Sequence, residues 1–150
     1  MPFSMLLNIV GSSNAKTKDV LWKFIKKFHK EVDPKKHKIF DSLTKYAINY
    51  FIDEVEPKKK FKEPNDSERQ VLLKLITNLK QIPQDKPAEE IQTMIYTIGK
   101  ENGYSKNLRD WFKLIYEVIF GEKNGPRMGF FISFFGVKET IDLLEKKLKI

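Results

Sequence analysis

The sequence contains no cysteine and only two histidines, His29 and His37. The missing thiols exclude disulfide frameworks and all thiol chemistry, and they permit a reducing compartment. Both histidines lie in a lysine-rich stretch whose positive field repels cations, and two histidines cannot hold zinc without carboxylate help. We therefore expect no metal site. A chain of 150 residues can bury about two-thirds of its unfolded surface without such a staple.

Long apolar runs are also missing. No segment approaches the roughly 20 apolar residues that a membrane span requires. The short run Phe3–Val10 lacks the basic region that precedes the apolar core of a signal peptide. We expect a cytoplasmic protein with no membrane partner.

Catalytic constellations are equally scarce. No nucleophile has a partnered base, and no carboxylate pair or metal cluster stands out. The glycines between Gly121 and Gly129 follow no strand, so we interpret them as a plain turn rather than a phosphate-binding loop. The chain by itself is expected to hold no cofactor.

Positive charge is what the sequence has in excess. The formal net charge is +8 and the pI about 9.5, which points to a polyanionic partner or to a solubility device. Nine lysines against three acidic residues lie between Lys16 and Lys38, and the run Lys58–Lys62 adds four more around one phenylalanine. Since lysine outnumbers arginine 25 to 3, codon bias in an AT-rich genome is an alternative source of this charge.

Apolar residues recur at helical spacing along almost the whole chain, and no segment alternates with a period of two for long enough to indicate a strand. The predicted class is all-α, with about eight helices in two small subdomains. The expected helices are residues 3–10, 17–30, 38–55, 67–79, 87–103, 108–120, 127–135 and 138–148.

Local signals place the helix ends. Thr17 is expected to cap the second helix, and Ser67 with Gln70 matches a capping box. Pro57 should stop the third helix, Pro87 is expected at the first position of the fifth, and Gly121 just after the sixth.

The apolar stripes predict which aromatic side chains enter the core. They assign Trp22, Tyr46, Tyr50 and Trp111 to buried faces. The charged, weakly helical stretch after the third helix is the best place for a hinge. We predict a first helical subdomain over residues 1–56, a basic hinge over 57–66 and a second helical subdomain over 67–150.

Four blocks of sequence, in this order, carry a family resemblance. They are Phe3–Val10, Lys18–Ile25, Tyr46–Asp53 together with Pro57–Phe61, and the segment Phe112–Gly136 with its Gly-x-x-x-Gly-Pro-Arg turn. The blocks resemble the C-terminal, anticodon-binding end of class I lysyl-tRNA synthetases and cover nearly the whole chain.

The resemblance implies an α-helix cage that grips the anticodon stem-loop of lysine tRNA. It also implies that ATP and lysine are used by a catalytic domain that is not in this sequence. The His-x-Gly-His and Lys-Met-Ser-Lys-Ser-like signatures with which class I synthetases hold ATP are absent here. The chain should therefore not catalyse alone, and Met1 is expected to be an artificial start or an internal methionine rather than a true N-terminus.

Arg127 is the leading candidate for a contact to a base or a phosphate of the tRNA. It is one of three arginines, and glycines at 125 and 129 permit close backbone approach around it. Lys123 lies on the same turn and is a further candidate. The alternative is that Arg127 bridges a helix junction and has only a structural role.

Other candidates come from the basic run and the third helix. Lys58, Lys59, Lys60 and Lys62 are expected to clamp phosphates, or else to be a solvated hinge. Phe61 could stack on a base or plug a packing gap. Within the family-like Asn49-Tyr50 block, Asn49 could read a uracil edge, with burial as the alternative fate of both residues.

Three other functions stay open at this point. The tail of a glutamyl-type class I synthetase shares the helix that ends in Leu-Gly. A basic helical module could also be a stand-alone RNA-binding or protein-interaction domain. The helix over residues 17–30 could lie on an acidic membrane surface, although a small domain needs its apolar stripe for the core. We expect a monomer.

Overall fold

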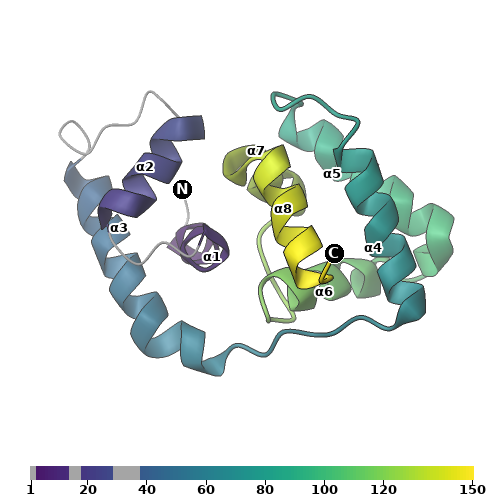
Figure 1. Ribbon diagram of the computed structural model, residues 1–150, viewed down its shortest axis with the longest axis horizontal. Helices are drawn as coiled ribbons and strands as arrows, with labels where there is room; N and C mark the ends of the chain where they lie inside the picture. Colours follow the sequence, from purple (N-terminus) through teal and green to yellow (C-terminus); the bar gives the residue numbers. More distant parts are fainter. Residues whose placement is uncertain (1–2, 14–17, 29–37) are drawn as a thin grey trace. The chain divides into compact units, whose positions relative to one another are not determined.

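The structure is a computed structural model that describes residues 3–13, 18–28 and 38–150. These residues form eight α-helices and no strand, which confirms the predicted all-α class (Figure 1). The helices are α1 Phe3–Ser13, α2 Lys18–Phe28, α3 Lys38–Tyr50, α4 Asp66–Leu79, α5 Ala88–Gly99, α6 Leu108–Ile119, α7 Met128–Phe135 and α8 Val137–Lys147. The predicted helix start at Thr17 and end at Lys30 lie outside the described residues, as do both histidines.

The chain divides into two compact units, residues 1–59 and 60–150. The first contains α1–α3 and the second α4–α8. The path of α3 continues through a π-helical turn, Phe51–Val55, which ends where the third helix was predicted to end. A separate 3-10 turn, Glu56–Lys58, follows, with Pro57 in its first positions. Proline fits there because the first positions of a helix need no N–H donor. The subdomain limits predicted at residues 56 and 67 stay a prediction.

Aliphatic side chains from all three helices form the core of the first unit. Ile9, Leu21 and Ala47 are fully buried. Trp22, predicted in the core, is 4% exposed, and its indole Nε1 donates a hydrogen bond to the Asp41 carboxylate at 2.7 Å. That bond ties α2 to α3.

The buried face of α3 and its extension leaves out two aromatic side chains that were predicted to be buried. It consists of Thr44, Ala47, Ile48 and Phe51, at the spacing i, i+3, i+4 and i+7. Tyr46 and Tyr50 are 60% and 39% exposed, so their predicted burial is wrong. Thr44 enters the core because its hydroxyl donates to the Asp41 carbonyl at 2.6 Å, which satisfies the polar group inside the helix. The phenols then lie on the outer face.

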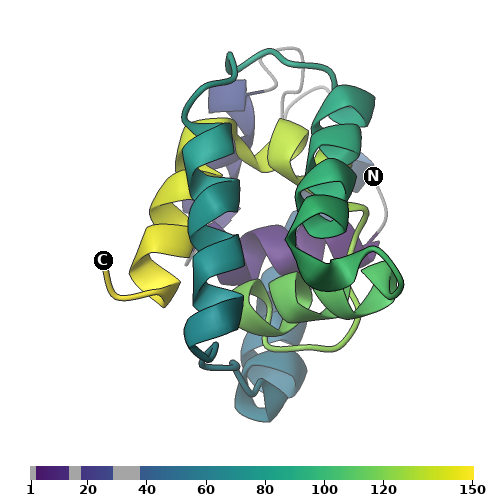
Figure 2. The same cartoon turned by 90° about the vertical axis from the view of Figure 1, so that its right-hand side faces the viewer.

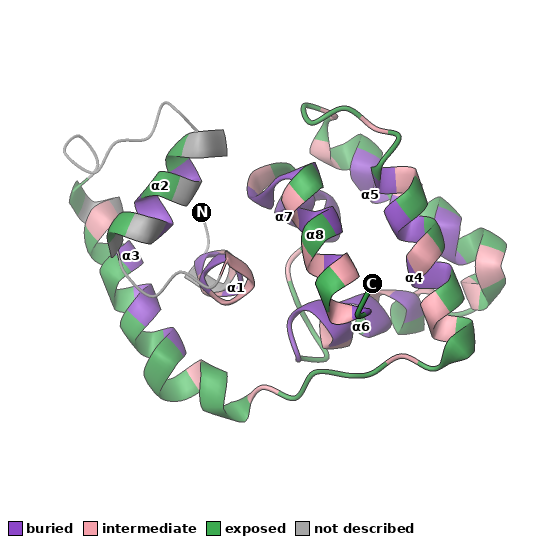
Figure 3. Cartoon of the chain, viewed as in Figure 1, coloured by how far each residue is buried: buried purple, intermediate pink, exposed green. Residues whose placement is uncertain are grey.

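In the second unit, the helices α4–α8, which are coloured teal to yellow in Figure 2, carry buried residues on their inner faces (Figure 3). On α4, the apolar residues at helical spacing are all buried, as that spacing predicts: Val71, Leu72, Leu75, Ile76 and Leu79. Trp111 is fully buried, and its indole Nε1 donates to the Ile95 carbonyl at 3.0 Å, which joins α6 to α5. Gly99 makes this packing possible, since a Cβ there would lie 2.5 Å from the Trp111 ring.

The start of α4 corrects one local prediction. Asn65, not Ser67, is the N-cap: its side chain accepts from the Glu68 N–H at 2.8 Å, and the Glu68 carboxylate accepts from the Asn65 N–H at 2.9 Å. Ser67 lies inside the helix. Both asparagine and serine can cap a helix. Asn65 is the cap here because α4 begins at Asp66, one residue before Ser67. Pro87 is likewise the N-cap of α5 rather than its first residue.

Gly121 follows α6 with a φ of 71°, as predicted for a glycine after a helix end. It opens the segment 121–127, which leads into α7. This turn positions the leading candidate for nucleic-acid contact.

Candidate nucleic-acid interface

The two glycines around Arg127 let the backbone of the turn pack closely against α5 and α6. A Cβ on Gly125 would lie 2.6 Å from the Tyr116 ring, and a Cβ on Gly129 would lie 2.2 Å from the Ala88 carbonyl oxygen. The buried Gly129 N–H also donates to the Gln92 side chain at 2.7 Å. The close approach inferred from the sequence is therefore an approach to α5 and α6, and it fixes the backbone that carries Arg127.

Arg127 is the N-cap residue of α7 and points a guanidinium nitrogen at Glu89 in the first turn of α5. The Nη2–Oε2 distance is 3.0 Å, and the two side chains are 51% and 66% exposed. Exposed pairs of this kind contribute about 0–1 kcal/mol to stability. The guanidinium is thus oriented by Glu89 while much of it still faces solvent. Lys123, on the same turn, is exposed.

A series of aromatic rings, not anticipated as a site from the sequence, runs from α5 across α6 to α7. The centroids of Tyr96 and Phe112 are 5.0 Å apart, those of Phe112 and Tyr116 6.5 Å, and those of Tyr116 and Phe120 6.2 Å. Phe120 then meets Phe131 of α7 edge to face at 4.9 Å. The i, i+4 spacing of residues 112, 116 and 120 was the signal for this series in the sequence.

The Tyr116 phenol lies within the electrostatic reach of two groups on this surface. Burial raises its pKa above the ordinary value of 10.0, the nearby Tyr96 adds to the rise, and the positive charge of Arg127 opposes it.

The basic run Lys58–Lys62 is divided between the two compact units, whose boundary falls between Lys59 and Lys60. Lys58 is exposed at the end of the 3-10 turn. Lys59 is half-buried, with its Nζ 5.5 Å from the centroid of the Phe51 ring. Lys60 is exposed and belongs to the second unit.

Lys60 and the turn of Arg127 are brought together by backbone contacts. The Lys60 N–H donates to the Gly121 carbonyl at 3.3 Å, and the Lys62 N–H donates to the Glu117 carbonyl at 3.0 Å. These bonds hold the extended segment along the end of α6, so Lys60 adjoins the loop that carries Lys123. No signal in the sequence indicated this pairing.

Lys62 is engaged with an acidic partner. Its Nζ lies 2.9 Å from a Glu68 oxygen, and the hydrogen bond to Glu68 raises the pKa of Lys62 although partial burial opposes the rise. The pocket it lines, about 260 Å³, also carries Asp110 and Glu117. The three carboxylates of this pocket outnumber its two lysines, Lys62 and Lys113, and this balance does not favour phosphate binding here.

Phe61 is 47% exposed and has a cation above one face. The Lys147 Nζ lies 3.5 Å from its ring centroid, and burial lowers the pKa of Lys147. The contact occupies one face of the ring that the sequence offered for stacking on a base.

Asn49 and Tyr50 are exposed on the outer face of α3. The Tyr50 ring stacks on Tyr46 at 6.2 Å between centroids, with 21° between the ring planes. Both residues are therefore accessible to a ligand in solvent.

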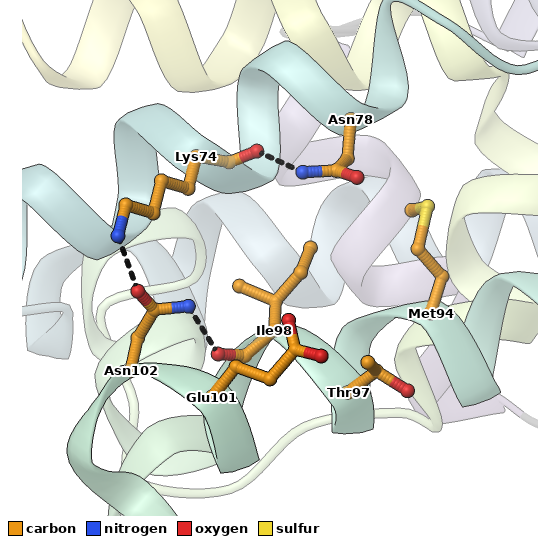
Figure 4. A pocket seen from close by; sticks show the side chains of 7 residues that line it. All are labelled: Lys74, Asn78, Met94, Thr97, Ile98, Glu101 and Asn102. Carbon is orange, nitrogen blue, oxygen red and sulfur yellow. Dashed lines mark hydrogen bonds between the residues drawn. The ribbon is translucent and has the colours of Figure 1, made fainter.

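A pocket of about 430 Å³ lies between α4 and the end of α5 (Figure 4). Lys74 Nζ donates to the Asn102 side-chain oxygen, the Asn102 amide donates to the Ile98 carbonyl at 2.7 Å, and the Asn78 amide donates to the Lys74 carbonyl at 2.8 Å. These polar groups satisfy one another, and the carboxylate of Glu101 also lines the pocket. The lining does not favour an anionic ligand.

Neither a metal cluster nor a membrane span is found within the described ranges. Among those residues, no group of three or more histidine, cysteine or acidic side chains could hold a metal ion. No helix there combines the length and the apolar character needed to cross a membrane.

Comparison with known proteins relates this chain to one kind of enzyme. The lysine–tRNA ligase of Rickettsia bellii is 38% identical over 146 residues, which is 97% of this chain. This chain is homologous to a portion of lysine–tRNA ligases. The lysine–tRNA ligases of Rickettsia felis and Roseobacter denitrificans are also 38% identical, over 97% and 99% of the chain. The chain spans 28% of the length of each of these ligases.

Two other comparisons gave no match. No protein-family model matches the chain. No solved structure matches it significantly. The relation to lysine–tRNA ligases therefore rests on sequence identity along the chain.

Proposed function

We propose that this chain binds the anticodon stem-loop of lysine tRNA as the non-catalytic, anticodon-binding portion of a class I lysine–tRNA ligase. The observation that carries the proposal is the 38% identity to a lysine–tRNA ligase over 97% of the chain. The matched region is 28% of that enzyme, so the use of ATP and lysine is assigned to other parts of the ligase. Transfer of lysine to tRNA is the activity of the whole enzyme in this proposal.

The electrostatics of the chain support a tRNA partner. The net charge of +8 attracts a polyanion, and Lys60 adjoins the turn that carries Lys123 and Arg127. Loops of RNA offer unpaired bases for stacking and for hydrogen bonds, while lysine and arginine hold the phosphates. The exposed Arg127 is suited to either contact.

The relatives favour lysine tRNA over the glutamyl-type alternative, because those compared above are lysine–tRNA ligases. A stand-alone basic RNA-binding module is the other function to separate. Such a module would bind many RNAs through phosphates, whereas an anticodon-binding domain must distinguish anticodons.

The test is a comparison of two RNAs that differ only in the anticodon. Fluorescence anisotropy would measure the binding of the chain to the anticodon stem-loop of lysine tRNA and to the same stem-loop with a substituted anticodon. We expect clearly tighter binding to the lysine anticodon. Equal affinity for both RNAs would contradict anticodon recognition, and no binding to either would contradict RNA binding altogether.

A further inference from the structure

Three half-exposed rings form a surface that we call the aromatic shelf, made of Tyr96 on α5 and of Phe112 and Tyr116 on α6. Tyr96 is 37% exposed, and the other two side chains are half-buried. Tyr96 meets Phe112 edge to face at 5.0 Å, and Phe112 lies 6.5 Å from Tyr116. An aromatic surface left partly in water on a small domain calls for an explanation.

The shelf rests on a rigid base. Tyr116 continues into Phe120 and Phe131, which are 1% and 0% exposed, so the deeper end of the ring series belongs to the core. Gly125 packs directly on the Tyr116 ring. The shelf is therefore held in one position by the turn and by the core, and a ligand that stacks on it would meet a preorganised surface.

Cationic side chains lie at both ends of the shelf. Arg127 follows Gly125 on the turn that covers Tyr116, and it lies close enough to influence that phenol electrostatically. At the other end, Lys100 is four residues after Tyr96 and Arg109 three residues before Phe112, and both are exposed. Glu89, which pairs with Arg127, supplies an anion at the first end.

We propose that the aromatic shelf stacks one unpaired base of the anticodon loop, while the flanking cations hold the adjoining phosphates. The inference rests on the proposed function and names the residues that carry out part of it. A nucleic-acid base is the occupant that matches partly exposed aromatic rings between cations, because bases stack on such rings and the backbone phosphates need positive charge. An apolar peptide would gain nothing from the cations.

The experiment combines changes in the protein with changes in the RNA. Tyr96→Leu and Phe112→Leu remove a ring while keeping an apolar side chain, and Tyr96→Phe keeps the ring as the matched control. Each protein would be titrated with the lysine anticodon stem-loop and with a set of stem-loops that carry an abasic site at one loop position at a time. Circular dichroism would confirm the helical content of each variant.

We expect each leucine variant to lose roughly five- to one-hundred-fold in affinity for the intact stem-loop, and Tyr96→Phe to bind like the original chain. At one loop position, the loss from the abasic site and the loss from Tyr96→Leu should not add, since both remove the same contact. A fluorescent adenine analogue at that position should be quenched on binding to the original chain and not to Tyr96→Leu.

Three outcomes would overturn the inference, and they are distinguishable. If the original chain distinguishes anticodons and both folded leucine variants bind the stem-loop with unchanged affinity, the shelf only packs and the proposed function stands. If the affinity loss from Tyr96→Leu and the loss from the abasic site add at every loop position, no base stacks on the shelf. If the original chain does not bind the stem-loop, the proposed function and this inference fail together.

Discussion

The guanidinium of Arg127, which precedes α7, forms a 3.0 Å ion pair with Glu89 in the first turn of α5, 38 residues earlier in the chain. Both side chains remain more than half exposed. The pair therefore orients Arg127 without burying it. An exposed arginine held in place by a carboxylate is compatible with a recognition role, and the ion pair also supplies the structural bridge that the sequence left as the alternative.

Replacing Arg127 by alanine separates these roles. If the guanidinium reads a base, Arg127→Ala should cost roughly 1–3 kcal/mol of binding free energy on the lysine stem-loop and much less on one with a substituted anticodon. The change in unfolding free energy should stay within about 1 kcal/mol, because the pair is exposed. Anisotropy and urea unfolding measure the two quantities. Unchanged affinity for both RNAs with reduced stability would mean that Arg127 is only a bridge.

The exposed lysines at the unit boundary should bind phosphates without regard to sequence. The double variant Lys58→Ala with Lys60→Ala should weaken binding to all tRNAs alike and reduce the log–log salt slope by about 0.7–0.9 for each phosphate that is no longer neutralised. Lys62→Ala is the matched control. The Lys62 amine already pairs with Glu68 at 2.9 Å, so its removal should change the salt slope little. A slope that falls for Lys62 and not for the double variant would reverse this assignment.

Acid should destabilise the chain in part through the capping box of α4. Burial works to raise the pKa of Glu68, but the hydrogen bonds from the Asn65 N–H and from Lys62 outweigh it and keep the pKa below the usual 4.5. The stabilisation is therefore complete above pH 4.5 and is lost as the pH falls through the lower folded value. Glu68→Gln, which can still cap, should lose less stability as the pH falls below 4.5, because it carries no carboxylate to protonate. Urea unfolding at a series of pH values measures the difference, and equal losses for both chains would contradict it.

The cap itself can be tested at neutral pH. Asn65→Ala should cost about 0.5–2 kcal/mol in urea unfolding, while Asn65→Gly should cost only a few tenths. Ser67→Ala is the control, because Ser67 lies inside α4. A larger loss for Ser67→Ala than for Asn65→Ala would show that the cap lies where the sequence first suggested.

The contact between α7 and α5 should tolerate no side chain at position 129. A Cβ on Gly129 would lie 2.2 Å from the Ala88 carbonyl and 2.9 Å from the Gln92 side chain, so Gly129→Ala should cost about 1–3 kcal/mol or more. At Gly103 a Cβ meets nothing within 4 Å, although φ is 99°, and alanine there should cost about 1 kcal/mol. Thermal unfolding measures the stability lost in each variant, which reflects crowding at position 129 and backbone strain at position 103. Equal losses would mean that α7 shifts to make room.

The sequence by itself determined the all-α class and much of the core. The aliphatic stripe of α4 and the burial of Trp22 and Trp111 followed from helical spacing, because a helix in a small domain must bury its apolar face. The family-like blocks alone also indicated lysine–tRNA ligases. These features depend on local order along the chain.

Only the tertiary structure decided which of several suitable residues does each task. Tyr46 and Tyr50 lie on the outer face because Thr44 and Ile48 occupy the inner one, and this depends on the helices that pack against α3. The placement of Lys60 beside Gly121 and the pairing of Arg127 with Glu89 join residues far apart in the chain. Helical periodicity describes one element at a time, so it cannot select contacts that form when separate elements pack together.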